Sequence, residues 1–297
     1  MSDELAEILD KYRANVVYVP NIGNAGDAFI AHATYQLFER LGVKYEMGNI
    51  AGLYPNRVII CGGGGNLVSE YNNMATFLKN NHNTWRTLVI LPHTIRSHGE
   101  VFDKMNSSCF IFCREERSLA FAKANAAKAN LFLSHDLAFG CRLDETAAKI
   151  TIKDVRDVAS FVANLRRNAR LQKRLSRDQR RAAMVAKRGT LNAFRTDAER
   201  TGIIVPCDNI DVSESFADNS MEPLVALHTT YRMLCFLKQF NIVRTNRLHV
   251  AIMSAKLGLD VQFYDNSYGK NRDIYERSMR GRYRNVRWHS SIANCDG

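Results

Sequence analysis

Short apolar runs alternate with segments of helical periodicity along the first half of the chain. Val16 to Pro20 is an apolar run typical of a buried strand, and in Asp27 to Gly42 the apolar side chains recur at the spacing of one helix face. The same unit recurs to about Cys141, with strand-like runs in RVIICGGGG, TLVILP, SCFIFCREE and LFLSHDLAF. Short apolar strands separated by helices predict a parallel sheet that is covered on both faces.

The second half of the chain begins with a different pattern. A long, basic and amphipathic segment at about 154–188 predicts one extended helix, and Leu191 to Phe194 follows it as an apolar strand. Alternation then resumes, with strands expected at 203–206, 241–246 and 260–266, and helices at 223–239 and 248–258. The pattern predicts the α/β fold class, with two Rossmann-like domains that face a cleft: residues 1–141 and residues 142–297.

Length and composition are those of a folded protein with room for two cores. The chain has 297 residues, of which 46% are hydrophobic and 24% are charged, values far from those of disordered chains. It contains no run of about 18 apolar residues that would span a membrane. Its first residues are acidic and amphipathic, which does not match a secretion signal. We therefore expect a cytoplasmic protein.

The cysteine pattern indicates neither a disulfide framework nor a structural metal. The seven cysteines include no Cys-x-x-Cys pair, and no histidine cluster has zinc-ligand spacing. Cys61, Cys109 and Cys113 lie in apolar strand-like runs, and we interpret them as small core residues. Reduced thiols are the norm for a cytoplasmic protein.

The net charge of +11 is concentrated in two segments. Arg166 to Arg188 contains ten basic residues and one acidic residue, and Lys270 to Arg287 contains seven and two, so the remainder of the chain is mildly acidic. The first segment contains no aromatic residue, whereas nucleic-acid grooves interleave basic and aromatic side chains. We expect no nucleic-acid partner, and we interpret the two basic patches as surfaces that meet phosphate groups.

Glycine-rich segments follow two predicted strands, at the edge of a parallel sheet where ligands bind. GNAGD contains Asn24 and Asp27, and two interpretations stay open: a helix start whose N–H groups face a ligand, or an ordinary turn capped by Asp27. CGGGGN contains Gly64, Gly65 and Asn66, and it matches no nucleotide-binding pattern. Each glycine in regular structure costs about 0.5–1 kcal/mol relative to alanine, so we predict a loop that lets a ligand approach the backbone.

Arginines follow two further strands. CREERS places Arg114 and Glu115 after a strand in the first half, and FRTDAE places Arg195, Asp197 and Glu199 after a strand in the second half. The planar guanidinium group donates two parallel hydrogen bonds, which suits a phosphate or a carboxylate. The alternative for Arg114 and Glu115 is a simple ion pair at a helix start.

Two histidines and a lysine occupy corresponding positions. LPHTI places His93 after its strand, TNRLH places Arg247, Leu248 and His249 at a helix start, and SYGKN places Lys270 after the next strand. A single histidine is more often structural. Here the neighbouring Arg247 favours a chemical role for His249, because the pair combines an anion clamp with an acid or base.

The ordered series GNAGD, CGGGGN, LPHTI, CREERS, SHDLAF, FRTDAE, TNRLH and YGKN resembles the polysaccharide pyruvyl transferases, particularly the bacterial exopolysaccharide branch. The resemblance extends from about Asn21 to Arg277, with no matching motif in the basic segment. It implies a two-domain fold like that of the GT-B glycosyltransferases. It also implies transfer of pyruvate from phosphoenolpyruvate to a sugar as a ketal, with release of phosphate.

The resemblance and the strand-end positions together assign roles to the candidate residues. By resemblance, Arg247 and His249 contact phosphoenolpyruvate, and Arg114 reaches its phosphate or carboxylate. The residues expected to bind this donor are Arg114, Arg247, Leu248, His249, Lys270, Gly64, Gly65 and Asn66. The residues expected at the acceptor or in the cleft are Asn24, Asp27, His93, Arg195, Asp197 and Glu199.

Ketal formation needs an acid that protonates the methylene carbon and a base that accepts a proton from a hydroxyl group. His249 is the expected acid, because an ordinary histidine titrates near neutral pH. Glu115, Asp197 and Glu199 stay open as the base, and the expected catalytic set is His249, Arg247 and Glu115. No metal is expected, and no cofactor beyond phosphoenolpyruvate as co-substrate.

Two alternatives to pyruvyl transfer stay open: a nucleotide-sugar glycosyltransferase of GT-B architecture, and a non-catalytic module that binds anionic lipid or nucleic acid. For a pyruvyl transferase, the expected acceptor is a sugar of a lipid-linked repeat unit at the inner face of the membrane. The basic patches are then either a peripheral contact with anionic headgroups or the solvated face of an ordinary helix.

Overall fold

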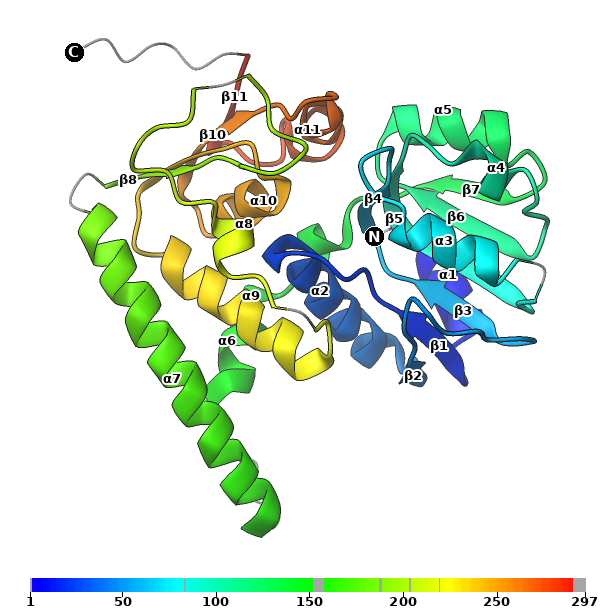
Figure 1. Ribbon diagram of the computed structural model, residues 1–297, viewed down its shortest axis with the longest axis horizontal. Coiled ribbons are helices and arrows are strands. Elements are labelled where there is room, and N and C mark those ends of the chain that lie inside the picture. Colours follow the sequence, from blue (N-terminus) through cyan, green and yellow to red (C-terminus); the bar gives the residue numbers. More distant parts are fainter. Residues whose placement is uncertain are drawn as a thin grey trace.

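The computed structural model describes residues 2–82, 84–151, 158–186, 189–202, 204–218 and 220–290. Figure 1 shows two sheets flanked by helices, with one long helix, Val158–Ala186, that extends away from the second sheet. Val155, Ile203 and both ends of the predicted basic segment lie outside the described residues.

The first sheet has seven strands, and all of its pairings are parallel. The order is β2-β1-β3-β5-β6-β7, and β4 pairs with the end of β5. Its strands are β1 (Val16–Val19), β2 (Tyr45–Met47), β3 (Val58–Cys61), β4 (Gly64–Leu67), β5 (Thr87–Ile95), β6 (Cys109–Cys113) and β7 (Asn130–Leu133). The accompanying helices are α1 (Asp3–Lys11), α2 (Ala25–Leu41), α3 (Asn73–Asn80), α4 (Gly99–Phe102) and α5 (Glu116–Asn125).

Both faces of this sheet are buried. Val17 and Val19 of β1 pack with residues of α3, α4 and α5, whereas Val16 and Tyr18 pack with residues of α1 and α2. Alternate side chains of a strand point to opposite faces, so a strand between two helical layers is apolar throughout. This explains why β1 reads as a continuous apolar run.

The second sheet has four parallel strands in the order β11-β10-β9-β8. Its strands are β8 (Thr190–Ala193), β9 (Ile242–Thr245), β10 (Asp260–Tyr264) and β11 (Val286–His289). The helical segments of this half are η1 (Leu137–Gly140), α6 (Leu143–Thr151), α7 (Val158–Ala186), α8 (Val212–Ser215), α9 (Pro223–Leu237), α10 (Leu248–Lys256), α11 (Lys270–Ile274) and the π-helical turn η2 (Tyr275–Met279). The parallel sheets and their helices confirm the predicted α/β class.

Helix α2 joins the two halves of the molecule. Figure 1 shows α2 beside α9, between the two sheets. Both helices contribute to one hydrophobic cluster that extends from α1 to the second sheet. The Tyr35 hydroxyl on α2 donates a hydrogen bond of 2.6 Å to the Met221 carbonyl, just before α9. This packing positions the amino-terminal end of α2 against the second half.

Helix α7 has two opposite faces. Leu171, Leu175 and Ala182 are buried, and α7 packs on α9. On the same face Asp178 accepts two hydrogen bonds from Arg232 of α9, at 2.9 and 3.2 Å. The exposed basic face consists of Arg170, Lys173, Arg174, Arg177 and Arg180. None of the helices among the described residues has the length and apolar character needed to cross a bilayer.

Three local predictions are wrong. Residues 204–206 form no strand, and Ile204 is 83% exposed, because this apolar run has no neighbouring strand with which to pair. Gly64–Leu67 form strand β4 instead of a loop. Helix α2 begins at Ala25, two residues before the predicted Asp27. The interpretation of Cys61, Cys109 and Cys113 as core residues is confirmed, since all three are buried.

Candidate active site

A cavity of about 440 Å³ lies between the two halves, at the carboxyl ends of their strands. Its walls come from residues that follow β1, β3 and β6 in the first sheet, and β8, β9 and β10 in the second. The predicted residues that line it are Asn24, Asp27, Gly65, Asn66, Arg114, Arg195, Asp197, Glu199, Arg247, Leu248, His249 and Lys270.

Arg114, directly after β6, is 1% exposed and held from two sides. Its Nε donates to Thr94 Oγ1 at 2.8 Å, and its Nη1 donates to Asp136 Oδ2 at 2.6 Å. Its Nη2 faces Gly65: a β-carbon on that glycine would lie 2.8 Å from Nη2 and 3.6 Å from Lys270 Nζ. Because Gly65 has no side chain, a recess about the size of an anionic oxygen remains at this position. Two cations lie next to it.

Gly64 and Asn66 shape this recess. Gly64 has φ of 142°, which other residues rarely adopt, and a β-carbon on it would lie 2.5 Å from Asn21 Nδ2. The Asn66 backbone N–H donates to His93 Nε2 at 3.2 Å. Burial, with the nearby Arg114, lowers the pKa of His93 to about 3, so the neutral ring accepts this bond.

The amino-terminal end of α2 forms the adjoining wall. Asn24 is the N-cap residue: its Oδ1 accepts the Gly26 N–H at 2.9 Å, and Asp27 Oδ2 accepts the Asn24 N–H at 3.0 Å. Asn24 Nδ2 also donates to Glu214 Oε1 of the second half at 3.0 Å. Asp27 thus completes the helix cap and also lines the cavity. The interpretation in which N–H groups of this helix face a ligand stays a prediction.

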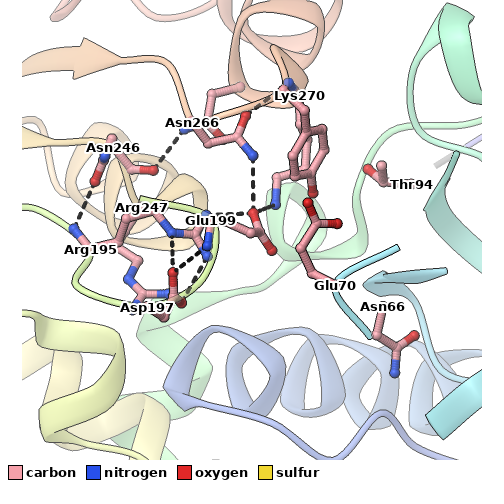
Figure 2. A network of polar contacts seen from close by, with 12 residues as sticks. Asn66, Glu70, Thr94, Arg195, Asp197, Glu199, Asn246, Arg247, Asn266 and Lys270 are labelled. Carbon is pink, nitrogen blue, oxygen red and sulfur yellow. Dashed lines mark hydrogen bonds and ion pairs between the residues drawn. The ribbon is translucent and has the colours of Figure 1, made fainter. Parts of the chain in front are cut away.

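Figure 2 shows a connected network of charged side chains that follow β8 and β10. Arg195 donates from Nε to Asp197 at 2.7 Å and from Nη1 to Glu199 at 2.6 Å. Lys270 Nζ donates to Glu199 at 2.7 Å. Burial alone raises the pKa of both carboxyl groups. Arg195 and Arg247 nevertheless lower the pKa of Asp197 below its usual range, and Lys270 and Arg195 do the same for Glu199. Both carboxylates therefore stay ionised.

Arg247, directly before α10, is held by three carboxylates. Its Nε and Nη2 donate to Asp211 at 2.8 and 2.5 Å, and its Nη1 donates to Asp197 at 2.7 Å. Glu214 Oε1 lies 3.2 Å from Nη2. Because Asp211 occupies the guanidinium fork, a direct contact between Arg247 and the donor stays a prediction.

His249 faces Asp136 across the boundary between the halves. Its Nε2 lies 3.4 Å from Asp136 Oδ2, and a β-carbon on Gly26 would lie 2.5 Å from its Nδ1. Burial by itself raises the pKa of Asp136, but His249 and Arg114 lower it below the usual range of a carboxyl group. The ionised Asp136 therefore contacts Arg114 and His249 through the same oxygen.

Three predicted residues do not line the cavity. Glu115 is completely buried and accepts hydrogen bonds from Ser118, Thr94 and Arg96, which leaves it no access to a substrate. His93 lies inside β5 and not after it, and it supports Asn66. Gly64 lies beside the cavity wall.

Three acidic residues at or beside the cavity were not predicted from the sequence: Asp136, Asp211 and Glu214. Asp136 comes shortly after β7, so the strand-end rule that selected Arg114 would have found it. Asp211 and Glu214 lie three residues apart, a spacing typical of a capped helix start, and they mark the beginning of α8. The signal was available in both cases, but it does not reveal that Asp211 contacts Arg247.

The cavity lining contains both cationic and acidic groups. At the recess, Arg114 Nη2 and Lys270 Nζ lie near the position that a β-carbon on Gly65 would occupy. Asp197 and Glu214 also line the cavity, and their carboxylate oxygens can accept hydrogen bonds. Among the described residues, no group of three or more His, Cys, Asp or Glu side chains is placed to hold a metal ion.

A family profile and a curated relative both indicate pyruvyl transferases. The profile of the family described as polysaccharide pyruvyl transferase matches residues 24–259. The chain is 26% identical over 307 residues to a Bacillus subtilis (strain 168) protein named "Putative pyruvyl transferase EpsO", with 93% of this chain and 89% of that protein covered. A crystal structure of an uncharacterised protein from Klebsiella pneumoniae subsp. pneumoniae NTUH-K2044 matches with a TM-score of 0.74 and 29% identity, over 98% of this chain and 100% of that one. The profile covers well over half of the chain and confirms the resemblance seen in the motifs: this protein belongs to the polysaccharide pyruvyl transferase family.

Proposed function

We propose that this protein transfers pyruvate from phosphoenolpyruvate to two hydroxyl groups of a sugar in an exopolysaccharide repeat unit, forming a ketal and releasing phosphate. The observation that carries the proposal is the recess at Gly65, where Arg114 Nη2 and Lys270 Nζ face the same position in the cavity that His249 lines. Membership of the family supports the same class of reaction.

Phosphoenolpyruvate suits this recess because it carries a carboxylate and a phosphate on adjacent groups. A charge-assisted hydrogen bond from a guanidinium to such an oxygen is about 2.7–2.9 Å long. Thr94 and Asp136 already hold Arg114, so the donor loses little affinity to ordering of that side chain. The reaction as proposed needs no cofactor beyond this co-substrate.

His249 acts as the general acid. Asp136 contacts Nε2 and orients the ring. The protonated ring, which lines the cavity, donates a proton to the methylene carbon of the donor. The sugar hydroxyls lie where Asp197 and Glu214 accept their hydrogen bonds. The two sheets, one on each side of the cavity, support a GT-B-like arrangement of the domains.

The acceptor is lipid-linked, and the protein meets the inner face of the membrane through the basic face of α7. This face is exposed, and the opposite face packs on α9, so the basic side chains are available to headgroup phosphates. Each basic residue near an anionic surface contributes about 1 kcal/mol of binding.

Arg170→Glu with Arg177→Glu is expected to abolish sedimentation with anionic vesicles, whereas Arg13→Glu on the opposite half leaves it unchanged. Equal sedimentation with neutral and anionic vesicles would contradict membrane contact.

The reaction is tested first by ligand-dependent thermal unfolding. At a hundredfold excess over Kd, phosphoenolpyruvate stabilises the folded state by about 2.7 kcal/mol, which raises the unfolding temperature by roughly 5 °C. Stabilisation by UDP- or GDP-sugars but not by phosphoenolpyruvate would indicate a glycosyltransferase. Salt-sensitive binding to duplex DNA, with no response to phosphoenolpyruvate, would indicate a non-catalytic module. Release of phosphate that depends on a sugar acceptor completes the test.

A further inference from the structure

Asp27 differs from the other carboxylates of the cavity. It is half-buried, and its Oδ2 accepts the Asn24 N–H at 3.0 Å. Its Oδ1 points toward Gly64 and would lie 3.4 Å from a β-carbon there. In the part of the chain that the structure describes, no ion pair includes Asp27, and its Oδ1 accepts no hydrogen bond.

The other candidate bases are engaged elsewhere. Arg195 donates hydrogen bonds to both Asp197 and Glu199. Arg247 donates a further bond to Asp197, and Lys270 donates a further bond to Glu199. These cations lower the pKa of both carboxyl groups, so each is a poor proton acceptor. Glu115 is buried outside the cavity. Glu214 accepts hydrogen bonds from Asn24 and Arg247. Among the described carboxylates that line the cavity, Asp27 is therefore the one without a cationic hydrogen-bond donor.

Burial raises the pKa of Asp27 above its usual value. The charged groups that face it oppose this effect without cancelling it: His249 from α10, Arg114 from the end of β6 and Lys270 from α11, together with the Asn24 N–H of its own helix cap. A carboxylate with a raised pKa is a stronger base than an ordinary surface aspartate.

Asp27 lies on the wall of the cavity that contains the Gly65 recess. Asp27, Gly65, Arg114 and Lys270 all line this cavity, and the charges of Arg114 and Lys270 act on the Asp27 carboxyl group. We therefore expect a donor whose anionic group occupies the Gly65 recess to lie within reach of the Asp27 carboxylate.

We propose that Asp27 is the catalytic base of this site, and that it shuttles one proton from the sugar to the departing phosphate. The inference rests on the proposed pyruvyl transfer. As His249 protonates the methylene carbon, the first sugar oxygen bonds to the central carbon and its proton passes to Asp27. The C–O bond to phosphate then breaks, the electron pair stays on the phosphate oxygen, and Asp27 returns its proton to that oxygen.

The second hydroxyl then attacks the central carbon and gives its proton to His249. One hydroxyl proton has thus reached the methyl group by way of His249, and the other has reached phosphate by way of Asp27. Both residues end in their starting protonation states, and the sum is one ketal and one hydrogen phosphate from one phosphoenolpyruvate and two hydroxyls. No further reactant is needed.

The test is Asp27→Asn, because an asparagine oxygen still accepts the Asn24 N–H and preserves the helix cap. We expect kcat to fall about 10²–10⁴-fold, while the stabilisation by phosphoenolpyruvate stays equal or grows, since a negative charge near the donor is removed. Wild-type activity is expected to fall as pH falls through the raised pKa of Asp27. Asp27→Glu is expected to restore part of kcat and this acidic limb. Asp3→Asn, which removes an acidic residue from the first turn of α1, is the matched control and keeps wild-type kcat.

The outcomes separate the two proposals. If the wild type releases no phosphate from phosphoenolpyruvate with any acceptor, the proposed function fails. If the wild type is active and Asp27→Asn stays within about threefold of its kcat, Asp27 is not the base. A variant that loses donor stabilisation and turnover together, without recovery in Asp27→Glu, would assign Asp27 a purely structural role and also overturn the inference.

Discussion

A single methyl group at Gly65 is expected to weaken donor binding without unfolding the protein. In Gly65→Ala the new β-carbon would lie 2.8 Å from Arg114 Nη2. That distance equals the length of a hydrogen bond from a guanidinium to an anionic oxygen, about 2.7–2.9 Å. The methyl group therefore occupies the position that we assign to the donor's oxygen. Arg114 has little freedom to move aside, because Thr94 and Asp136 hold its Nε and Nη1.

The size of the effect follows from the lost contact. A hydrogen bond to a charged group contributes about 1.5–3 kcal/mol, so its loss weakens donor binding roughly 10- to 150-fold. Displacement of Lys270 Nζ, 3.6 Å from the same position, adds to this loss. The KM for phosphoenolpyruvate is expected to rise by this factor, with a smaller change in the KM for the acceptor.

Two other glycines serve as references. Gly140→Ala places a β-carbon with no atom within 4 Å and is expected to keep wild-type kinetics. Gly64→Ala forces a side chain onto φ of 142° and is expected to lower stability. Initial-rate kinetics of phosphate release, with unfolding temperatures measured in parallel, distinguish the three variants. A folded Gly65→Ala protein with the wild-type KM for phosphoenolpyruvate would refute the assignment of the recess.

Further changes test the chemistry and the fold. His249→Ala is expected to lower turnover at least about 100-fold with an unchanged circular dichroism spectrum, and near-normal turnover would remove it from the reaction. Arg232→Met leaves the buried Asp178 without its cation and is expected to lower the free energy of unfolding in urea by about 3–5 kcal/mol. Arg174→Met breaks an exposed ion pair and is expected to lower it by about 0–1 kcal/mol. Burial lowers the pKa of His93 in the folded state to about 3. As pH falls below 6.5, the imidazole of His93 therefore binds a proton in the unfolded state but not in the folded state. The free energy of unfolding then falls by up to about 1.4 kcal/mol per pH unit. Urea unfolding of His93→Gln between pH 7 and 4 is expected to show a shallower slope, and equal slopes would contradict this account.

The sequence predicted most of the architecture because its strongest patterns come from burial. The continuous apolar run of β1 requires helices on both faces, and the structure has them. Residues 204–206 show the limit of this reasoning. Their apolar character is local, whereas strand formation depends on a pairing partner that is distant in sequence. The packing of α2 on α9 could not be predicted from the sequence either. The periodicity of a helix shows that one face is buried but not which element covers it.

Candidate site residues were found where position along a strand determines them. Arg114, Arg195 and Arg247 all follow strands, and the parallel topology brings all three to one cavity. The role of each residue depends on its contacts, which spacing does not specify. Glu115 follows Arg114 in sequence, yet its side chain is buried among Thr94 and Ser118.

The contacts of the cationic side chains also change how the charge of the cavity is interpreted. The sequence suggests a cluster of free cations for a strongly anionic donor. In the structure all four cations are bonded to carboxylates: Arg195 and Arg247 to Asp197, Arg114 to Asp136 and Lys270 to Glu199. The bonds from Arg195 and Arg247 keep Asp197 ionised. At the Gly65 recess, Arg114 and Lys270 also lie near a space that a side chain on residue 65 would fill. The absence of that side chain matters there as much as the two charges. Under the proposed function, recognition of the donor depends on where glycine exposes a cation, and the number of arginines near the cavity is a poor guide to it.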